Sequence, residues 1–146
     1  MKAIVARLPK TGLCLFQPWA TQVVRGEIPL LVRSQGSTSN IVIGIVATTF
    51  LNRVEREEKD LPEKSIVGTA RIHEVVKLKV GEVVNYIDKV YGHEVVDKYP
   101  FKILIPDKNY YYVYRLIDPF EFKNPIPLSR KFLRGWVPLG LKGKKT

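Results

Sequence analysis

Cysteine and histidine are scarce in this 146-residue sequence, which contains one cysteine and two histidines. The chain can therefore form no internal disulfide, and it has no cluster of cysteine and histidine that would hold a structural zinc ion. No apolar run approaches the roughly 20 residues that span a bilayer, and the N-terminus lacks the apolar core of a signal peptide. We therefore expect a reduced, cytoplasmic protein with no membrane association, no metal and no cofactor.

Familiar catalytic and nucleotide-binding motifs are also missing. The sequence has no GxSxG, no phosphate loop of the GxxxxGK[ST] type and no GxGxxG. HEVVK at 73–77 and HEVVD at 93–97 begin like a zinc-protease HExxH motif, but lysine and aspartate replace its second histidine. Cys14 lies in an apolar run, so we expect it to be buried rather than reactive.

Acidic residues are rare at both ends of the chain, although the net charge is +10. Residues 1–54 contain six basic residues and one acid, and residues 123–146 contain seven basic residues and none. A fold that brings these two ends together would form one basic face able to attract a polyanion. The alternative is a basic protein whose charge serves only its solubility.

The length and the 45% hydrophobic composition fit one domain, which we place at residues 1–141, before a basic disordered tail at 142–146. Two helices are predicted, one between Pro18 and Gly26 and one over 80–91 that ends at Gly92. Gly68 marks either a bulge or a close backbone approach. Little regular structure is expected after residue 123 beyond a short terminal strand. Short apolar and β-rich runs predict strands at 2–6, 13–16, 28–33, 41–48, 65–78, 102–105 and 110–122.

Strands outnumber the short helices in this pattern. The predicted fold is therefore α+β, a small mixed β-barrel with short helices at its rim. The 41–48 strand is β-branched on both faces, which is typical of a central strand buried on both sides.

The predicted first helix has two faces. Trp19 and Val23 share the face that we expect to pack, whereas Thr21, Gln22 and Arg25 point elsewhere and are free to bind. Gly26 is expected to end this helix in a left-handed conformation.

Three segments, LCLFQPWATQVVRGE, SIVGTARIHEVVKL and PFEFKNPIPLSRKFLRGWVPL, follow one another in an order that resembles the ASCH domain family of the PUA-like superfamily. Those domains show a Q-P-W/Y-A helix that runs into a G-x-K-x-x-E-x-R turn. They continue with an I-x-G-x-A/V strand and a P-I-P…G-x-W/L closing strand. The resemblance covers most of the chain. It implies a pseudo-barrel with a cleft beside the opening helix, and a role in RNA binding.

The sequence departs from this family pattern at two positions. Some small ASCH proteins hydrolyse acetylated cytidine with the motif's lysine, a threonine and a glutamate, but Ile28 and Leu31 stand where this chain would need the first two. Neither side chain can transfer a proton or act as a nucleophile. We therefore expect a non-catalytic RNA-binding module. A nucleoside hydrolase, with Thr69, Glu74 and Glu94 as its only candidate residues, and a protein-interaction module are the alternatives.

The predicted binding residues lie in a cleft between the first helix and the C-terminal segment. Arg33 either grips phosphate or pairs with an acid, and Arg25 either binds phosphate or compensates the helix dipole. Trp136 stands among cations in RKFLRGW and either stacks on a base or packs in the core. The full predicted set is Gln22, Arg25, Gly26, Arg33, Lys123, Arg130, Lys131, Arg134 and Trp136.

The run YYYVYR at 110–115 alternates between two faces of a predicted strand. Tyr110, Tyr112 and Tyr114 share one face, and Tyr111 shares the other with Val113. One face must be core. The other is either a base-stacking platform or a tyrosine ladder on the barrel wall.

Overall fold

The computed structural model describes residues 8–50, 61–98, 109–128 and 135–139. The predicted strands at 2–6 and 102–105, the predicted tail, and Arg130, Lys131 and Arg134 lie outside these ranges. The chain divides into two compact units. The first unit comprises Met1–Glu27, Val42–Arg71 and Asp118–Thr146, and the second comprises Ile28–Ile41 and Ile72–Ile117.

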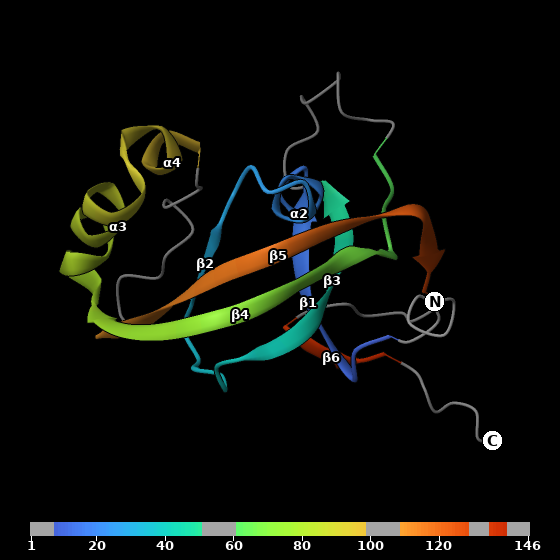
Figure 1. Ribbon diagram of the computed structural model, residues 1–146, viewed down its shortest axis with the longest axis horizontal. Helices are drawn as coiled ribbons and strands as arrows, with labels where there is room; N and C mark the ends of the chain where they lie inside the picture. The colour runs from blue at the N-terminus through green and yellow to red at the C-terminus, as the bar shows by residue number, and fades with distance from the viewer. Residues whose placement is uncertain (1–7, 51–60, 99–108, 129–134, 140–146) are drawn as a thin grey trace. The chain divides into compact units, whose positions relative to one another are not determined.

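Six strands and a few short helices make up the described chain (Figure 1). The hydrogen-bonded strand order is β2-β5-β4-β3-β1-β6, with β1 parallel to β3 and antiparallel to β6. This mixed sheet with short helices confirms the predicted α+β class. In chain order the elements are β1 (Thr11–Gln17), α2 (Trp19–Val24), β2 (Leu30–Arg33), β3 (Ile41–Phe50), β4 (Ser65–Lys79), the 3-10 helix η2 (Val80–Glu82), α3 (Val83–Tyr91), α4 (His93–Lys98), β5 (Tyr110–Pro127) and β6 (Trp136–Pro138).

Helix α2 in the first unit begins and ends where the sequence predicts. Pro18 precedes its first residue, and Gly26 follows it with a φ of 81°. The N–H of Gly26 donates to the carbonyl of Val23 over 3.0 Å. The glycine adopts the left-handed conformation that ends a helix, because it has no Cβ to oppose it.

The core of the first unit forms around β3, whose residues 43–47 are all buried between β4 and β1. This confirms the prediction of a central strand. Cys14 is also buried, as predicted. It belongs to an apolar cluster of Cys14, Val46, Ile66, Val137 and Leu139, against which Leu8, Phe122 and Leu128 pack.

Gly68 marks a close backbone approach between β4 and β5. A Cβ at this position would collide with the carbonyl oxygen of Phe120 and with the side chain of Val24. Of the two predicted roles of Gly68, close approach is therefore the right one. Only a residue without a side chain lets the strand and the helix pack this closely.

Strand β5 continues to Pro127, five residues beyond its predicted end. The prediction stopped early because proline removes a ladder donor. The N–H of Leu128 donates to the carbonyl of Lys64, and successive residues of a strand direct their N–H groups to opposite edges. Pro125 and Pro127 have the other parity, so the N–H groups that they lack would point away from β4.

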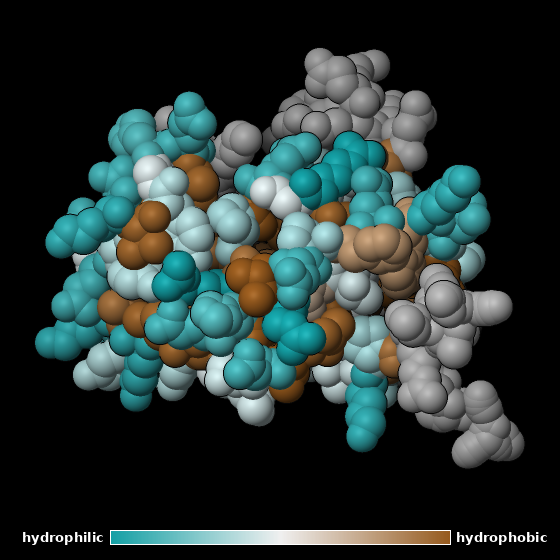
Figure 2. Space-filling model, viewed as in Figure 1, coloured by the Kyte–Doolittle hydropathy of each residue, from teal (hydrophilic) through white to brown (hydrophobic). Residues whose placement is uncertain are grey.

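The second unit contains β2, the later part of β4, the earlier part of β5, α3 and α4. The predicted helix over 80–91 is η2 followed by α3, and it ends at Gly92, whose φ is 103°. Val83 and Ile87 form the buried face of α3. Figure 2 shows the surface over α3 and α4 as largely hydrophilic with isolated hydrophobic groups. The helix is thus amphipathic, with one packed stripe.

Candidate nucleic-acid interface

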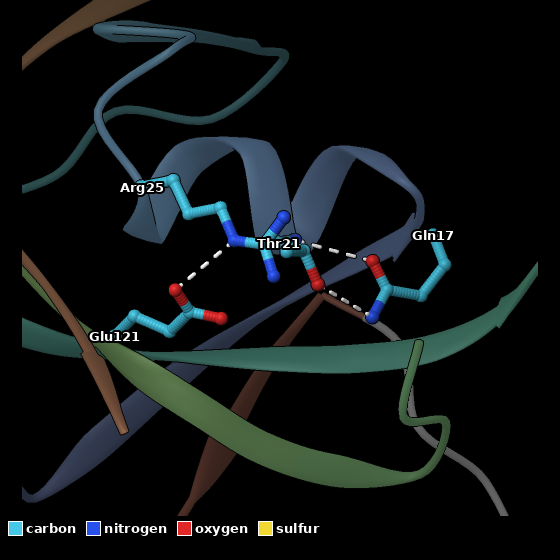
Figure 3. Close-up of polar contacts among 4 residues, drawn as sticks. All are labelled: Gln17, Thr21, Arg25 and Glu121. Atoms are coloured by element: carbon cyan, nitrogen blue, oxygen red, sulfur yellow. Dashed lines mark hydrogen bonds and ion pairs between the residues drawn. The ribbon is translucent and has the colours of Figure 1, made fainter. Parts of the chain in front are cut away.

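The start of α2 is held by a buried hydrogen-bond cluster between Gln17 and Thr21 (Figure 3). The Gln17 amide nitrogen donates to Thr21 Oγ1 over 2.9 Å and to the carbonyl of Pro62 over 2.7 Å. Its amide oxygen accepts from the N–H of Thr21 over 3.1 Å. Both side chains are almost wholly buried. The prediction that Thr21 lies on a free face is therefore wrong, because a buried amide at the end of β1 requires a partner there.

Trp19 is half-buried rather than fully packed. Its ring meets that of Phe16 edge to face, with 6.3 Å between ring centroids.

Arg25 extends from the end of α2 to Glu121 of β5 (Figure 3), and its Nε donates to Glu121 Oε1 over 3.0 Å. This hydrogen bond raises the pKa of Arg25 above its ordinary value. Both side chains are more than 40% exposed, so the pair contributes at most about 1 kcal/mol to stability. Arg25 thus remains accessible, but a phosphate would have to compete with Glu121 for it.

The structure describes four other predicted binding residues in the first unit, which are Gln22, Gly26, Lys123 and Trp136. Gln22 has a buried Oε1 with no hydrogen-bond partner among the described residues, and Gly26 is exposed. Lys123 is exposed on β5, two residues beyond Glu121 on the same strand face. Trp136 is half-buried on β6, where it pairs with Leu13 of β1.

Three strands separate β5 from β6 in the hydrogen-bonded order, so Lys123 and Trp136 are not on neighbouring strands. Arg25 and Lys123 are the two predicted cations that the structure describes in the first unit. Eleven of the 24 basic residues and nine of the 14 acidic ones lie in the described ranges. Because most of the positive excess lies elsewhere in the sequence, the basic cleft with Arg130, Lys131 and Arg134 stays a prediction.

Ile28 and Leu31, in the second unit, are core residues. They are 1% and 2% exposed, and Leu31 pairs with the fully buried Tyr114 of β5. Apolar side chains buried to this degree offer no reactive group to a ligand.

The second unit instead brings cations and tyrosines together on one sheet face. Lys77 Nζ of β4 lies 4.6 Å from the centroid of the Tyr110 ring and 6.0 Å from that of Tyr112. Arg33 pairs with Tyr112 across β2 and β5, which puts their side chains on the same face. Arg33 has no ion pair among the residues that the structure describes, so its predicted structural pairing with an acid finds no support there.

The tyrosine face changes from exposed to buried along β5. Tyr110 is 43% exposed, Tyr112 is half-buried and Tyr114 is buried. On the opposite face Tyr111 and Val113 are buried, which confirms that one face is core. The start of the tyrosine face is therefore the part that a ligand can reach.

A pocket of about 350 Å³ opens beside this face. The loop that joins β2 to β3 contributes its two lining serines, Ser37 and Ser39, and β5 contributes Tyr112. The remaining lining residues come from β4 and are His73, Glu74, Val75 and Lys77. Together these residues supply hydroxyl groups, a cation, an imidazole and an aromatic ring around one opening.

Two contacts anchor the loop that forms one wall of this pocket. The Tyr114 hydroxyl donates to the carbonyl of Gln35 over 2.5 Å. Gly36 lies so close to Tyr112 that a Cβ on it would be 3.2 Å from the ring. The loop that forms this wall is therefore held in place by contacts within the second unit.

The carboxylate of Glu74 belongs to a hydrogen-bonded group that it forms with Arg115 and Tyr91. Arg115 Nη1 donates to Glu74 Oε1 over 2.9 Å, and Arg115 Nε donates to the Tyr91 hydroxyl over 3.1 Å. These hydrogen bonds, the one to Tyr91 first, raise the pKa of Arg115, whereas burial raises the pKa of Tyr91. Glu74 is thus tied to an arginine, which disfavours a role as a catalytic base.

Two further sequence expectations concern metal and membrane sites. Across residues 8–50, 61–98, 109–128 and 135–139 no group of histidine, cysteine and carboxylate side chains is arranged to hold a metal ion. Among the helices that the structure describes, none is both long and apolar enough to cross a membrane.

The sequence prediction missed Lys77, His73, Ser37 and Ser39. Alternation in YYYVYR identified a face with Tyr110 and Tyr112 but gave no sign of what lies beside it. The signal that places Lys77 there is the register of β4 on β5, which is a long-range property.

Comparisons with known proteins give structural likenesses only. No protein-family model matches the chain, and no curated protein matches it. The structure is similar to that of ASCH from Zymomonas mobilis, with a TM-score of 0.64 and 18% identity over 88% of this chain and 86% of that one. A mutant form of that Zymomonas mobilis protein gives a TM-score of 0.63 and 18% identity, covering 90% of this chain and 91% of the other. The N-terminal domain of Staphylothermus marinus McrB gives a TM-score of 0.53 and 14% identity over 88% and 87% of the two chains.

Proposed function

The chain has the ASCH-like α+β fold that the sequence predicts, and from this premise we propose that it is a non-catalytic module that binds RNA. The single observation that carries the proposal is the position of Lys77 over Tyr110 and Tyr112, with Arg33 paired to Tyr112 from the other side of β5. Aromatic rings stack on unpaired bases, and neighbouring cations bind the phosphates that connect those bases.

The exposure of this group supports the same function. Tyr110 and Lys77 are exposed, and Arg33 is half-buried without a described acidic partner. An arginine in that position keeps its planar fork free for a bidentate phosphate contact. Single-stranded RNA therefore fits the face better than a duplex, whose bases are stacked on one another and paired.

Residues of the first unit add to the proposal as phosphate contacts. Lys123 is exposed, and Arg25 is accessible beside Glu121. We include Gln22, Gly26 and the sequence-predicted Arg130, Lys131 and Arg134 in the same role, and Trp136 as a base-stacking residue.

A hydrolase acting on a modified nucleoside is the weaker candidate. Ile28 and Leu31 are buried and apolar, and the Glu74 carboxylate is bound by Arg115. Thr69 lies in the first unit, whereas Glu94 is exposed on α4 of the second. We expect acetylated cytidine to stay unchanged when it is incubated with the protein.

Fluorescence anisotropy with labelled single-stranded RNA tests the function directly. We expect binding at low salt that weakens steeply between about 50 and 200 mM salt, because phosphate contacts release counterions. A duplex of the same length should bind more weakly. Binding no tighter than that of an acidic control protein would overturn the proposal, and protein capture that persists after nuclease treatment would favour an interaction module instead.

A further inference from the structure

We propose that the pocket lined by Ser37, Ser39, Tyr112 and residues 73–75 and 77 captures one unpaired nucleobase. The inference rests on the proposed RNA-binding function and names the part of the RNA that this site takes. All lining residues of the pocket belong to the second unit, and none of them is in the set predicted for the cleft beside α2.

The main chain of β4 offers hydrogen-bonding groups to a ligand in this pocket. The carbonyl of Ile72 accepts from the N–H of Asn40 over 2.6 Å, and β3 begins at the next residue, Ile41. Among the described residues, no strand therefore continues past this point along the edge of β4 that pairs with β3, whereas β5 lies along its other edge. Because alternate strand residues direct their N–H and C=O groups to the same edge, those of Glu74 point to the same side as the carbonyl of Ile72.

Glu74 lines the pocket although Arg115 holds its carboxylate. Its side chain also lies on the strand face opposite to those of His73 and Val75. The main-chain N–H and C=O of Glu74 are thus the groups that this residue offers to a ligand. A donor beside an acceptor matches the Watson–Crick edge of a nucleobase, which likewise carries a donor next to an acceptor.

The side chains that line the pocket offer further contacts to a nucleotide. Tyr112 offers a ring on which a base can stack, and Lys77 beside it offers a cation for the adjoining phosphate. The hydroxyl group of Ser39 can donate or accept, and that of Ser37, which donates to the carbonyl of Thr38 over 3.2 Å, can still accept, so they suit the polar atoms of a base. The 34–40 loop is anchored by Tyr114 and by the Gly36 contact, so little ordering is needed on binding.

An open strand edge can also pair with an extended peptide. Here Ser37 and Ser39 of the loop line a single pocket of about 350 Å³ together with this edge of β4. A compact, flat ligand fits such a pocket better than a long extended chain. A base that is already paired in a duplex cannot present its Watson–Crick edge, so the ligand is an unpaired one.

Three oligonucleotides of equal length test the proposal: ordinary RNA, the same backbone with every base removed, and that backbone with one central base restored. We expect the abasic backbone to bind through its phosphates, and one restored base to tighten binding at least about fivefold. Equal binding of the abasic and one-base strands would overturn the inference and leave RNA binding intact. No binding of any strand would overturn the proposed function.

A pair of loop variants tests the location. Ser37→Leu fills the pocket without changing charge, whereas Ser34→Leu alters an exposed position of the same loop that does not line it. We expect the Ser37 variant to lose the gain from the single base but to keep abasic binding, and the Ser34 variant to keep both. Loss of the gain in both variants, or in neither, while both unfold like the wild type, would overturn the assignment to this pocket.

Discussion

The Nζ of Lys77 lies 4.6 Å from the centroid of the Tyr110 ring, which joins the later part of β4 to the start of β5. An exposed pair of this kind contributes about 0.5 to 1 kcal/mol. Its main consequence is positional, because it holds a flexible lysine beside the rings on which bases would stack. Lys77 remains exposed, so its ammonium group can still meet a phosphate.

Removing Lys77 should lower the affinity for RNA and should also make that affinity less dependent on salt concentration. For Lys77→Ala we expect the slope of log affinity against log salt to become shallower by about 0.7, the value for one phosphate contact to a single strand. Lys89→Ala, at an exposed position on α3, is the matched control and should leave the slope unchanged. Identical slopes for the two variants would show that Lys77 does not contact the backbone.

The buried cluster below α2 should contribute to stability rather than to binding. Thr21→Val keeps the side-chain shape but removes the acceptor of the Gln17 amide. We expect the free energy of unfolding in urea to fall by about 1 to 3 kcal/mol, because a buried donor loses a partner. Thr49→Val, at an exposed site of β3, should change it by less than about 0.5 kcal/mol. Similar values for both would argue against the cluster.

Gly68 gives a second stability test. Gly68→Ala forces a methyl group against the Phe120 carbonyl, so we expect a loss of about 1 to 3 kcal/mol in the free energy of unfolding. Gly81→Ala is a fitting control, since a Cβ there meets nothing within 4 Å. It should be neutral or slightly stabilising. A Gly68→Ala protein as stable as the wild type would contradict the close approach of β4 and β5.

The ionisation of Tyr91 should make the free energy of unfolding depend on pH in the alkaline range. Burial raises its pKa in the folded protein, so above the unfolded value of about 10 the unfolded state binds fewer protons than the folded state. The corresponding stability is complete below about pH 10 and is lost as the pH rises through the folded pKa. Urea unfolding at several pH values should show a shallower alkaline decline for Tyr91→Phe than for Tyr110→Phe, whose tyrosine is exposed. Equal declines would contradict this assignment.

Local rules were enough to predict much of the fold. Gly26 and Gly92 end helices with positive φ, and β3 is buried on both faces, because backbone freedom and side-chain alternation are encoded within a few residues. The extension of β5 to Pro127 was missed, because whether a proline is tolerated depends on which strand edge is open.

The candidate site depends on contacts that local rules do not reach. Arg25 and Glu121 are 96 residues apart, and the pocket combines a loop, β4 and β5. Thr21 was assigned to the wrong face because helical spacing cannot show which face is buried, and the Gln17 amide that contacts Thr21 is itself bound to the carbonyl of Pro62, 45 residues away. Arg33 and the tyrosine face were predicted, but their relation to Lys77 required the strand register.

The most direct measurement is a titration of isotope-labelled protein with single-stranded RNA at low salt, followed by amide NMR. RNA binding through the Lys77 face predicts saturable shifts at Arg33 to Asn40, His73 to Lys77 and Tyr110 to Tyr112. Shifts confined to Gln22 to Gly26 and Glu121 to Lys123, or no shifts at all, would contradict the account.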